Sequence, residues 1–166
     1  MMSTFTDRTA LAHLKALHIE NSKQRHPSLP YHSSPAFSAG KTNGLTKCII
    51  HFLRLKGHHV ERTGNEGRVI DTRETYTDLV GLTRTIGSIQ RVRSSGMAGT
   101  SDLKAIINGR FIAIEVKCQS TKDRQRPSQK LYQTQIESSG GIYTIASSFA
   151  QFLNWYYDNY GGQGNG

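Results

Sequence analysis

The chain has 166 residues, with 21 Lys and Arg against 12 Asp and Glu, a net charge of +9 and a pI near 9.8. This length fits one domain with an appendage, and the charge favours a polyanionic partner, with nucleic acid the first candidate. Nowhere do about 18 apolar residues run together, which excludes a membrane span. The N-terminus lacks an apolar signal segment and the chain has only two cysteines, Cys48 and Cys118, so we expect a reducing, cytoplasmic (intracellular) setting.

The first 42 residues differ from the rest. Leucines at positions 11, 14 and 17, followed by Ile19, form a weak helical pattern that predicts one short helix. Residues 21–41 hold three of the four prolines and many serines, which is typical of a linker or an arm lying on the surface. We therefore predict an N-terminal extension over residues 1–42 and a second domain over residues 43–166.

The second part opens with a predicted helix from residue 43 to about Lys56, capped by Thr42 or Asn43 and stopped by Gly57. His58–Arg62 is a predicted strand, and Gly64–Gly67 is a predicted turn.

Residues 68–95 give a mixed signal. Val69–Asp71 and Ile89–Val92 are predicted strands with a long polar connection between them. Arginines here either bind phosphate through their planar fork of donors or form surface ion pairs with the nearby acids, and the sequence does not separate the two. The arginines are Arg68, Arg73, Arg84, Arg91 and Arg93, and the acids are Asp71, Glu74 and Asp78. The glycine-containing segment Ser94–Gly99 either lets a DNA backbone approach Asp102 closely or simply forms a turn.

A β-hairpin is predicted over Asp102–Ile107 and Arg110–Lys117, because Asn108-Gly109 between alternating apolar residues is the strongest short hairpin signal. A two-residue loop fixes the register: Ile107 faces Arg110, and counting outward places Asp102 opposite Glu115. Lys117 lies on the same face as Glu115 because side chains alternate along a strand. The other face is apolar, with Leu103, Ala105, Ile112, Ile114 and Val116.

Two opposed carboxylates repel each other, so this face needs a compensating cation. Carboxylate oxygens suit Mg²⁺, or Mn²⁺, which binds one or two carboxylates and keeps several waters. Alternatively, the hairpin is a solvated surface element with a charge pattern and no function. The apolar runs that flank the charges favour a buried hairpin and therefore a metal site.

Beyond the hairpin, Cys118–Pro127 is a polar and basic loop, and Pro127 or Ser128 opens a helix that Gly140-Gly141 ends. Gln129, Tyr132, Gln133 and Ile136 share one helix face by their spacing. Ile142–Ala146 is a predicted strand, and Ser147 or Ser148 caps a last helix. Its aromatic stripe either stacks bases or packs in the core, and the core interpretation is favoured.

The combination of Asp102 with Glu115-Val116-Lys117 after a hairpin-length gap resembles the bipartite signature of the PD-(D/E)xK nucleases. With Gly99, Ser101, Gln129 and Gly140-Gly141 added, the pattern is similar to the VRR-NUC branch, which is Holliday-junction-resolvase-like. The resemblance covers residues from about 43 to 160. It implies an α/β fold with a restriction-endonuclease-like core, in which a central mixed β-sheet is flanked by helices.

The resemblance also implies a metal held by Asp102, Glu115 and the backbone carbonyl of Val116. Lys117 is expected to orient or deprotonate water or to neutralise developing charge, and Gln129 to hydrogen-bond the water or a phosphate oxygen. Family members often carry a further glutamate on the first helix, but no acidic residue stands between Glu20 and Glu61.

We therefore expect a divalent-metal-dependent endonuclease acting on DNA, including structured or branched DNA. The alternative is a catalytically inactive nucleic-acid-binding or regulatory protein that keeps the nuclease fold. The expected phosphate contacts are Arg91, Arg93, Lys122, Arg124 and Arg126. A homodimer is a further expectation, since cutting both strands takes two sites.

Overall fold

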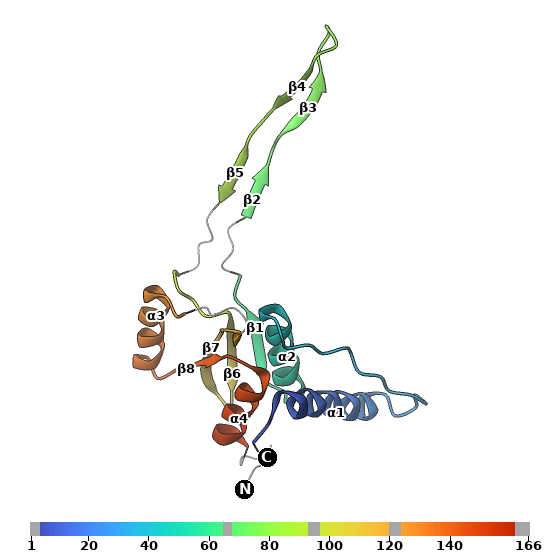
Figure 1. The fold of residues 1–166 in the computed structure, drawn as a ribbon, viewed down its shortest axis with the longest axis vertical. Coiled ribbons are helices and arrows are strands. Elements are labelled where there is room, and N and C mark those ends of the chain that lie inside the picture. The colour runs from blue at the N-terminus through green and yellow to red at the C-terminus, as the bar shows by residue number, and fades with distance from the viewer. Residues whose placement is uncertain (1–3, 65–67, 93–96, 120–123, 162–166) are drawn as a thin grey trace.

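A four-stranded mixed sheet in the order β1-β6-β7-β8 is the framework of the chain (Figure 1). The computed structural model describes residues 1–166 except 1–3, 65–67, 93–96, 120–123 and 162–166. The helices are α1 (Asp7–Arg25), α2 (Thr42–Leu55), α3 (Pro127–Ser138) and α4 (Phe149–Tyr160). The strands are β1 (His59–Arg62), β2 (Arg68–Asp71), β3 (Glu74–Thr77), β4 (Thr83–Ile86), β5 (Ile89–Val92), β6 (Leu103–Ile107), β7 (Arg110–Val116) and β8 (Ile142–Ala146).

Strand directions make the sheet mixed. β6 runs antiparallel to both β1 and β7, whereas β7 and β8 are parallel and α3 lies between them in the chain. Parallel neighbours need a crossover connection, which the helix α3 provides. The predicted mixed α/β class, with a central mixed sheet flanked by helices, is confirmed.

The β6–β7 hairpin forms as the sequence predicts. Asn108 and Gly109 have φ angles of 50° and 76°, the positive values that a type I′ turn requires at both central positions. Ile107 pairs with Arg110 and Leu103 pairs with Ile114, so the predicted register is confirmed across the strands.

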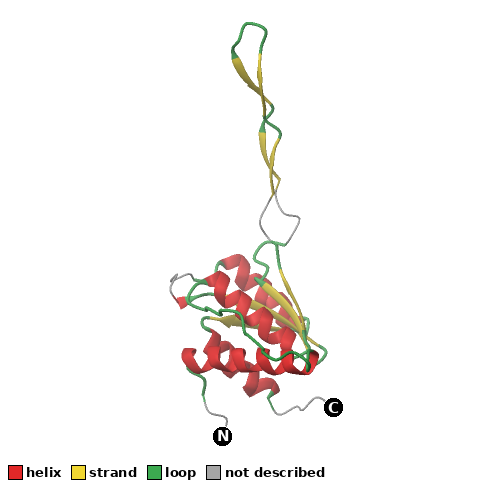
Figure 2. Ribbon diagram, turned by 90° about the vertical axis from the view of Figure 1, so that its right-hand side faces the viewer, coloured by secondary structure: helices red, strands yellow, loops and turns green. Residues whose placement is uncertain are grey.

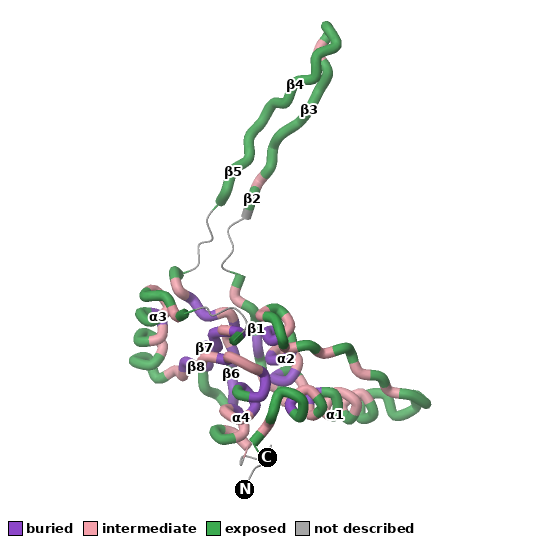
Figure 3. Tube along the Cα trace, in the orientation of Figure 1, coloured by how far each residue is buried: buried purple, intermediate pink, exposed green. Residues whose placement is uncertain are grey.

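One face of the sheet carries the main core. Leu103, Ala105, Ile112 and Ile114 point into a cluster with residues of α1, α2 and α4. Phe52 lies at its centre, in edge contact with Phe149, Phe152 and Tyr156 of α4. The aromatic stripe of the last helix is therefore core, as expected. The opposite face carries a smaller cluster of Ala113 with Tyr132 and Tyr143, to which α3 contributes. Figure 3 shows buried residues gathered on the sheet β1-β6-β7-β8 and the helices beside it, whereas β3, β4 and β5 are exposed.

Helix α1 lies within the predicted N-terminal extension and packs against the core. Thr6 caps it by accepting the Thr9 N–H, and its buried residues Ala10 and Leu14 belong to the main cluster. Phe5 bonds through its N–H to the Asn154 side chain of α4. The helix is 19 residues long, which is more than the short helix expected. Packing against the core supplies the stability that its weak apolar pattern alone does not predict.

Two local expectations for α2 have different outcomes. Gly57 follows the helix with φ of +80° and ends it, as predicted. The predicted cap is wrong, since Lys41 occupies the N-cap position and Thr42 is already helical. The hydroxyl of Thr46 donates to the Thr42 carbonyl instead.

The long polar connection predicted between Val69–Asp71 and Ile89–Val92 is wrong, because β3 and β4 lie within it. Residues 68–77 run antiparallel to residues 83–92. Together they form one ribbon that extends away from the four-stranded sheet and its helices (Figures 1 and 2). Thr and Tyr in β3 and β4 suit extended backbone, and Asp78 forms the turn between them. Residues 65–67 of the turn predicted at Gly64–Gly67, and residues 94–96 of the predicted Ser94–Gly99 segment, lie outside the described residues.

In the described part of the chain, we find no helix with the length and apolarity that crossing a membrane requires. Cys48 and Cys118 are both buried free thiols.

The histidines around α1 and α2 lead to a prediction on pH. Burial, the largest cause, lowers the pKa of His13, His51 and His58 below the ordinary 6.5, with further lowering by nearby positive charges. Below pH 6.5 the unfolded chain binds more protons than the folded chain, so stability falls as the pH drops from about 6.5 through the lowered folded values. We expect the urea concentration at the unfolding midpoint to decrease when the pH is lowered from 7.5 to 5.5. In His51→Gln this decrease is expected to be smaller, because one of these histidines is gone. A midpoint that does not change with pH would contradict this.

Candidate active site

The two acids of the motif meet where β6 begins and β7 ends. Asp102 directly precedes β6, and its Oδ2 accepts the Val116 N–H at 2.9 Å. This bond ties the Asp102 carboxylate to the strand that carries Glu115. The Asp102 carboxylate lies close enough for its negative charge to raise the pKa of Glu115. The structure therefore brings the two predicted carboxylates together.

Glu115 is a buried carboxylate with an incomplete set of partners. The residue is 2% exposed, and its Oε1 accepts a hydrogen bond from Gln129 Nε2 and lies 3.2 Å from Lys117 Nζ. Its Oε2 is buried and has no hydrogen-bond partner among the described residues. A buried carboxylate oxygen without a partner costs free energy, since the interior cannot replace its lost hydration.

Burial raises the pKa of Glu115 above its usual range, and the charge of Asp102 raises it further. Lys117 and Gln129 act in the opposite direction without cancelling the first two effects. The described residues therefore leave the negative charge of Glu115 incompletely compensated. A cation bound at Oε2 would supply the missing compensation.

Gln129 is held in place by two bonds that use both ends of its amide. Its Oε1 accepts the Arg126 N–H at the start of α3, while its Nε2 donates to Glu115. Gln129 therefore caps α3 and fixes Glu115 with one side chain. The expected position of Gln129, in the first turn of the helix beside the end of the strand, is confirmed.

Gly99 lets α3 approach the site. Its φ is +81°, and a Cβ there would come within 2.7 Å of the Gln129 backbone nitrogen and closer still to the Ser128 carbonyl. Only glycine accommodates both the backbone conformation and the contact. The glycine of the motif thus serves the placement of Gln129.

Two further residues complete the surroundings. Ser101 is fully buried, donates to the Leu103 carbonyl at 2.9 Å and bonds with the Tyr132 hydroxyl. Tyr143 of β8 has a pKa raised to about 12, first by burial and then by the charge of Glu115. Sequence reasoning did not single out Tyr143 as a site residue, because an aromatic residue in an apolar strand carries no local signal of a neighbouring acid.

The five residues predicted to contact phosphate do not form one group among the described residues. Arg126 and Arg124 are exposed beside the start of α3, and Arg126 is joined to Gln129 through its backbone. Arg91 is exposed on β5, in the ribbon, and no described contact joins it to the carboxylates. Arg93 and Lys122 lie outside the described residues.

The donor set fits a hard divalent cation of the Mg²⁺ type. Asp102 and Glu115 provide oxygen ligands, and Mg²⁺ characteristically takes one or two carboxylates and retains water. Among the described residues no group of three His, Cys, Asp or Glu side chains could hold a metal. The first turn of α2 carries no acid, so this helix contributes no third carboxylate.

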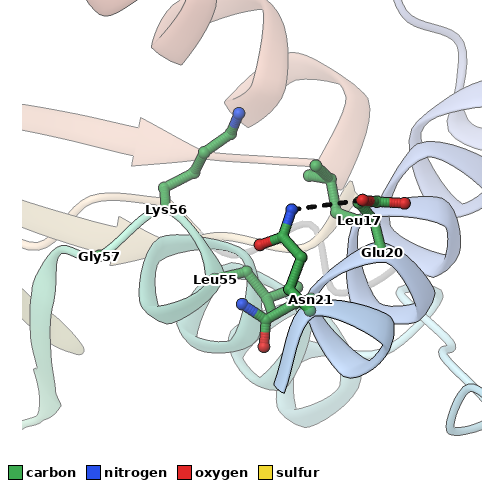
Figure 4. A pocket seen from close by; sticks show the side chains of 7 residues that line it. Leu17, Glu20, Asn21, Leu55, Lys56 and Gly57 are labelled. Atoms are coloured by element: carbon green, nitrogen blue, oxygen red, sulfur yellow. Dashed lines mark hydrogen bonds between the residues drawn. The ribbon is translucent and has the colours of Figure 1, made fainter. Parts of the chain in front are cut away.

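A pocket of about 350 Å³ lies elsewhere, between α1 and the end of α2 (Figure 4). Its lining consists of Leu17, Glu20, Asn21, Gln24, Leu55, Lys56 and Gly57. It shares no residue with the carboxylate site and is a separate feature.

The fold and the site together define a mixed α/β protein with a buried carboxylate, Glu115, beside the half-buried Asp102 and a lysine. The chain matches no known family model. It also has no significant match among curated proteins.

Gly99→Ala tests the contact that places Gln129. The added methyl group strains the positive φ and pushes against the Ser128–Gln129 peptide, so we expect a loss of about 1–3 kcal/mol in the free energy of unfolding. Gly40→Ala is the matched control, because a Cβ there meets nothing within 4 Å. Urea denaturation measures both, and equal stability of the two variants would contradict the role assigned to Gly99.

The pKa of Glu115 tests the coupling of the two acids. Asp102→Asn is expected to lower this pKa in metal-free protein and Lys117→Met to raise it, while Asp158→Asn on α4 leaves it unchanged. Because the folded pKa exceeds the ordinary 4.5, the folded state binds more protons between the two values, and metal-free stability falls as pH rises through that window. Carboxyl ¹³C NMR titration measures the pKa. If the pKa of Glu115 rose in Asp102→Asn, the two carboxylates would not be coupled as described.

Proposed function

We propose that this protein is a divalent-metal-dependent endonuclease that hydrolyses phosphodiester bonds in DNA, on a restriction-endonuclease-like core. The observation that carries the proposal is that Oε2 of buried Glu115, beside Asp102 and next to Lys117, has no partner among the described residues. A buried carboxylate with one uncompensated oxygen beside a second acid is costly for a structural protein and useful in a cation site.

The residues present divide the chemistry among them. Asp102 and Glu115, with the backbone carbonyl of Val116, would hold the metal. When bound, Mg²⁺ or Mn²⁺ supplies Lewis-acid activation of water and of the scissile phosphate. Gln129 occupies Glu115 Oε1 and leaves Oε2 for the cation.

Lys117 is the residue best placed to act on the phosphate or the attacking water. Its side chain is 11% exposed and lies 3.2 Å from Glu115 Oε1, so its ammonium is held at the site in a partly water-excluded setting. There a positive charge stabilises the negative charge that develops on the phosphorane-like transition state more strongly than in water. Tyr132 and Tyr143 pack on the same side of the sheet and limit water access to Glu115.

The charge of the chain supports DNA as the substrate. A net charge of +9 favours a polyanion, and exposed Arg124 and Arg126 lie beside the first turn of α3, near the carboxylates. Arg91, Arg93 and Lys122 extend the proposed phosphate-binding set. Structured or branched DNA is the substrate class that the VRR-NUC resemblance suggests.

One observation favours a second function, a catalytically inactive nucleic-acid-binding protein with the nuclease fold. The first turn of α2 lacks the acid that family members often carry there, which reduces the charge available to hold a metal. The test below therefore measures cleavage and binding on the same DNA.

A cleavage assay on supercoiled plasmid and on linear, flap, fork and four-way DNA tests the proposal. We expect Mg²⁺- or Mn²⁺-dependent cleavage that Asp102→Asn, Glu115→Gln and Lys117→Met each reduce by about 10² or more, since each removes a charge used in the transition state. Asp158→Asn, an exposed acid on α4, is the matched control and is expected to cleave like the unaltered chain.

Metal binding gives a second readout that does not need turnover. Addition of Mg²⁺ is expected to raise the melting temperature of the unaltered chain and of Asp158→Asn but not that of Asp102→Asn. Cleavage that survives all three site substitutions would place the activity elsewhere. Salt-sensitive DNA binding with no cleavage of any substrate would favour the inactive binding protein.

A further inference from the structure

The ribbon formed by β2, β3, β4 and β5 is called here the arm (residues 68–92). Within the described parts of the chain its strands pair only with one another, so that both of its edges are unpaired there: Arg68 stands opposite Val92, and Thr77 stands opposite Thr83. The backbone bond from Thr72 to Ser88 continues the register between the two halves. At ~3.3 Å per residue, the arm extends about 33 Å.

The arm exposes apolar side chains along its whole length. Those at least 45% exposed are Val69, Tyr76, Leu79, Val80, Leu82, Ile86, Ile89 and Val92. A two-stranded ribbon alone is marginally stable in water, and an extended apolar surface of this kind indicates a contact with another molecule.

The tip of the arm is an ordered turn. Asp78 Oδ1 accepts the N–H groups of Val80 and Leu82, at 3.1 and 2.9 Å, and its Oδ2 accepts from Arg84 Nε at 2.7 Å. These bonds hold Leu79 and Val80 outward, where Leu79 is fully exposed and Val80 is 82% exposed. Two aliphatic side chains fixed in this way are suited to insertion into an apolar surface.

The low net charge of the arm favours a protein over DNA as its partner. The arm has four arginines and three acids, a net charge of +1 out of the +9 of the chain, which leaves +8 on the remaining residues. Two of its arginines are neutralised within the arm, Arg73 by Asp71 at 2.8 Å and Arg84 by Asp78 at 2.7 Å. The arm therefore carries little of the excess positive charge of the chain, and Arg91 at its base is its one proposed phosphate contact.

We propose that the arm binds the arm of a second copy of this chain, antiparallel, so that the tip of each arm covers the base of the other. Exposed apolar residues stand at the tip (Leu79, Val80, Leu82) and at the base (Val69, Ile89, Val92), which makes the arm self-complementary under a two-fold axis. Each arm offers 25 residues, within the roughly 20–30 residues per side of a stable interface.

Charge also favours the antiparallel arrangement. The part of each chain outside the arm, called here the body, has a net charge of +8. The antiparallel arrangement places the two bodies at opposite ends of the paired arms, where their mutual repulsion is smallest. A contact between the bodies themselves would bring like charges together. This interface does not depend on the proposed nuclease activity.

Sedimentation equilibrium of the full chain, without DNA or divalent metal, tests the interface. We expect a dimer whose dissociation constant the double variant Leu79→Ser, Val80→Ser raises by more than about tenfold. Leu29→Ser and Leu131→Ser, at exposed positions outside the arm, are matched controls expected to dimerise normally. Ile89→Ser gives a second test at the base of the arm and is expected to weaken the dimer as well. Circular dichroism checks that each variant is folded.

Salt and cross-linking sharpen the test. Dimerisation is expected to strengthen from about 0.05 to 0.5 M salt because screening reduces the repulsion between the bodies, whereas DNA binding weakens. Since Cys48 and Cys118 are buried, mixing Val80→Cys with Val69→Cys is expected to give a tip-to-base disulfide. A tip-to-tip disulfide from Val80→Cys alone would overturn the antiparallel arrangement.

Two results would overturn the second copy as the partner. The first is a monomer at all salt concentrations up to about 100 µM chain. The second is a monomer whose DNA binding is lost in the Leu79→Ser, Val80→Ser variant, which would assign the arm to DNA. Because the mass is measured without substrate, a failure of the nuclease proposal would leave the dimer result intact.

Discussion

The hydrogen bond from the Val116 N–H to Asp102 Oδ2 is the contact on which the rest of the site depends. It joins the start of β6 to the end of β7 and brings a second carboxylate near Glu115, against electrostatic repulsion. The protein tolerates this arrangement because both strands are anchored by apolar side chains on the opposite face, and Leu103, Ile112 and Ile114 are fully buried there. Hydrophobic burial on one face thus offsets the electrostatic cost on the other.

The hairpin was predictable because its determinants are local. Asn108-Gly109 fixes the turn, the turn fixes the register, and the register fixes which side chains share a face. The same locality explains β8 and α4, where the strand limits and the Ser148 cap follow directly from the sequence. The nuclease function that we propose rests on this geometry together with the resemblance of Asp102, Glu115 and Lys117 to the PD-(D/E)xK signature.

Features that depend on distant contacts were not predictable. The length of α1 follows from packing of Ala10 and Leu14 against the core and from the Phe5–Asn154 bond, partners 149 residues apart. Tyr143 becomes part of the site only because β8 pairs beside β7 and places it near Glu115. The strands β3 and β4 are mostly polar and exposed on both faces, so the alternation that normally reveals a strand is missing.

The arm and the site share one anchoring point. The arm lies in the chain between β1 and β6. The N–H of Thr63, which precedes the arm, donates to the backbone carbonyl of Asp102, which follows it. Arg62 pairs with Leu103 in the adjacent strands, so both ends of the insertion are fixed by the sheet that holds the carboxylates. The chain segment that carries the arm therefore begins and ends beside Asp102. In a two-fold assembly, the arm would set the spacing between two such sites without contributing a side chain to either.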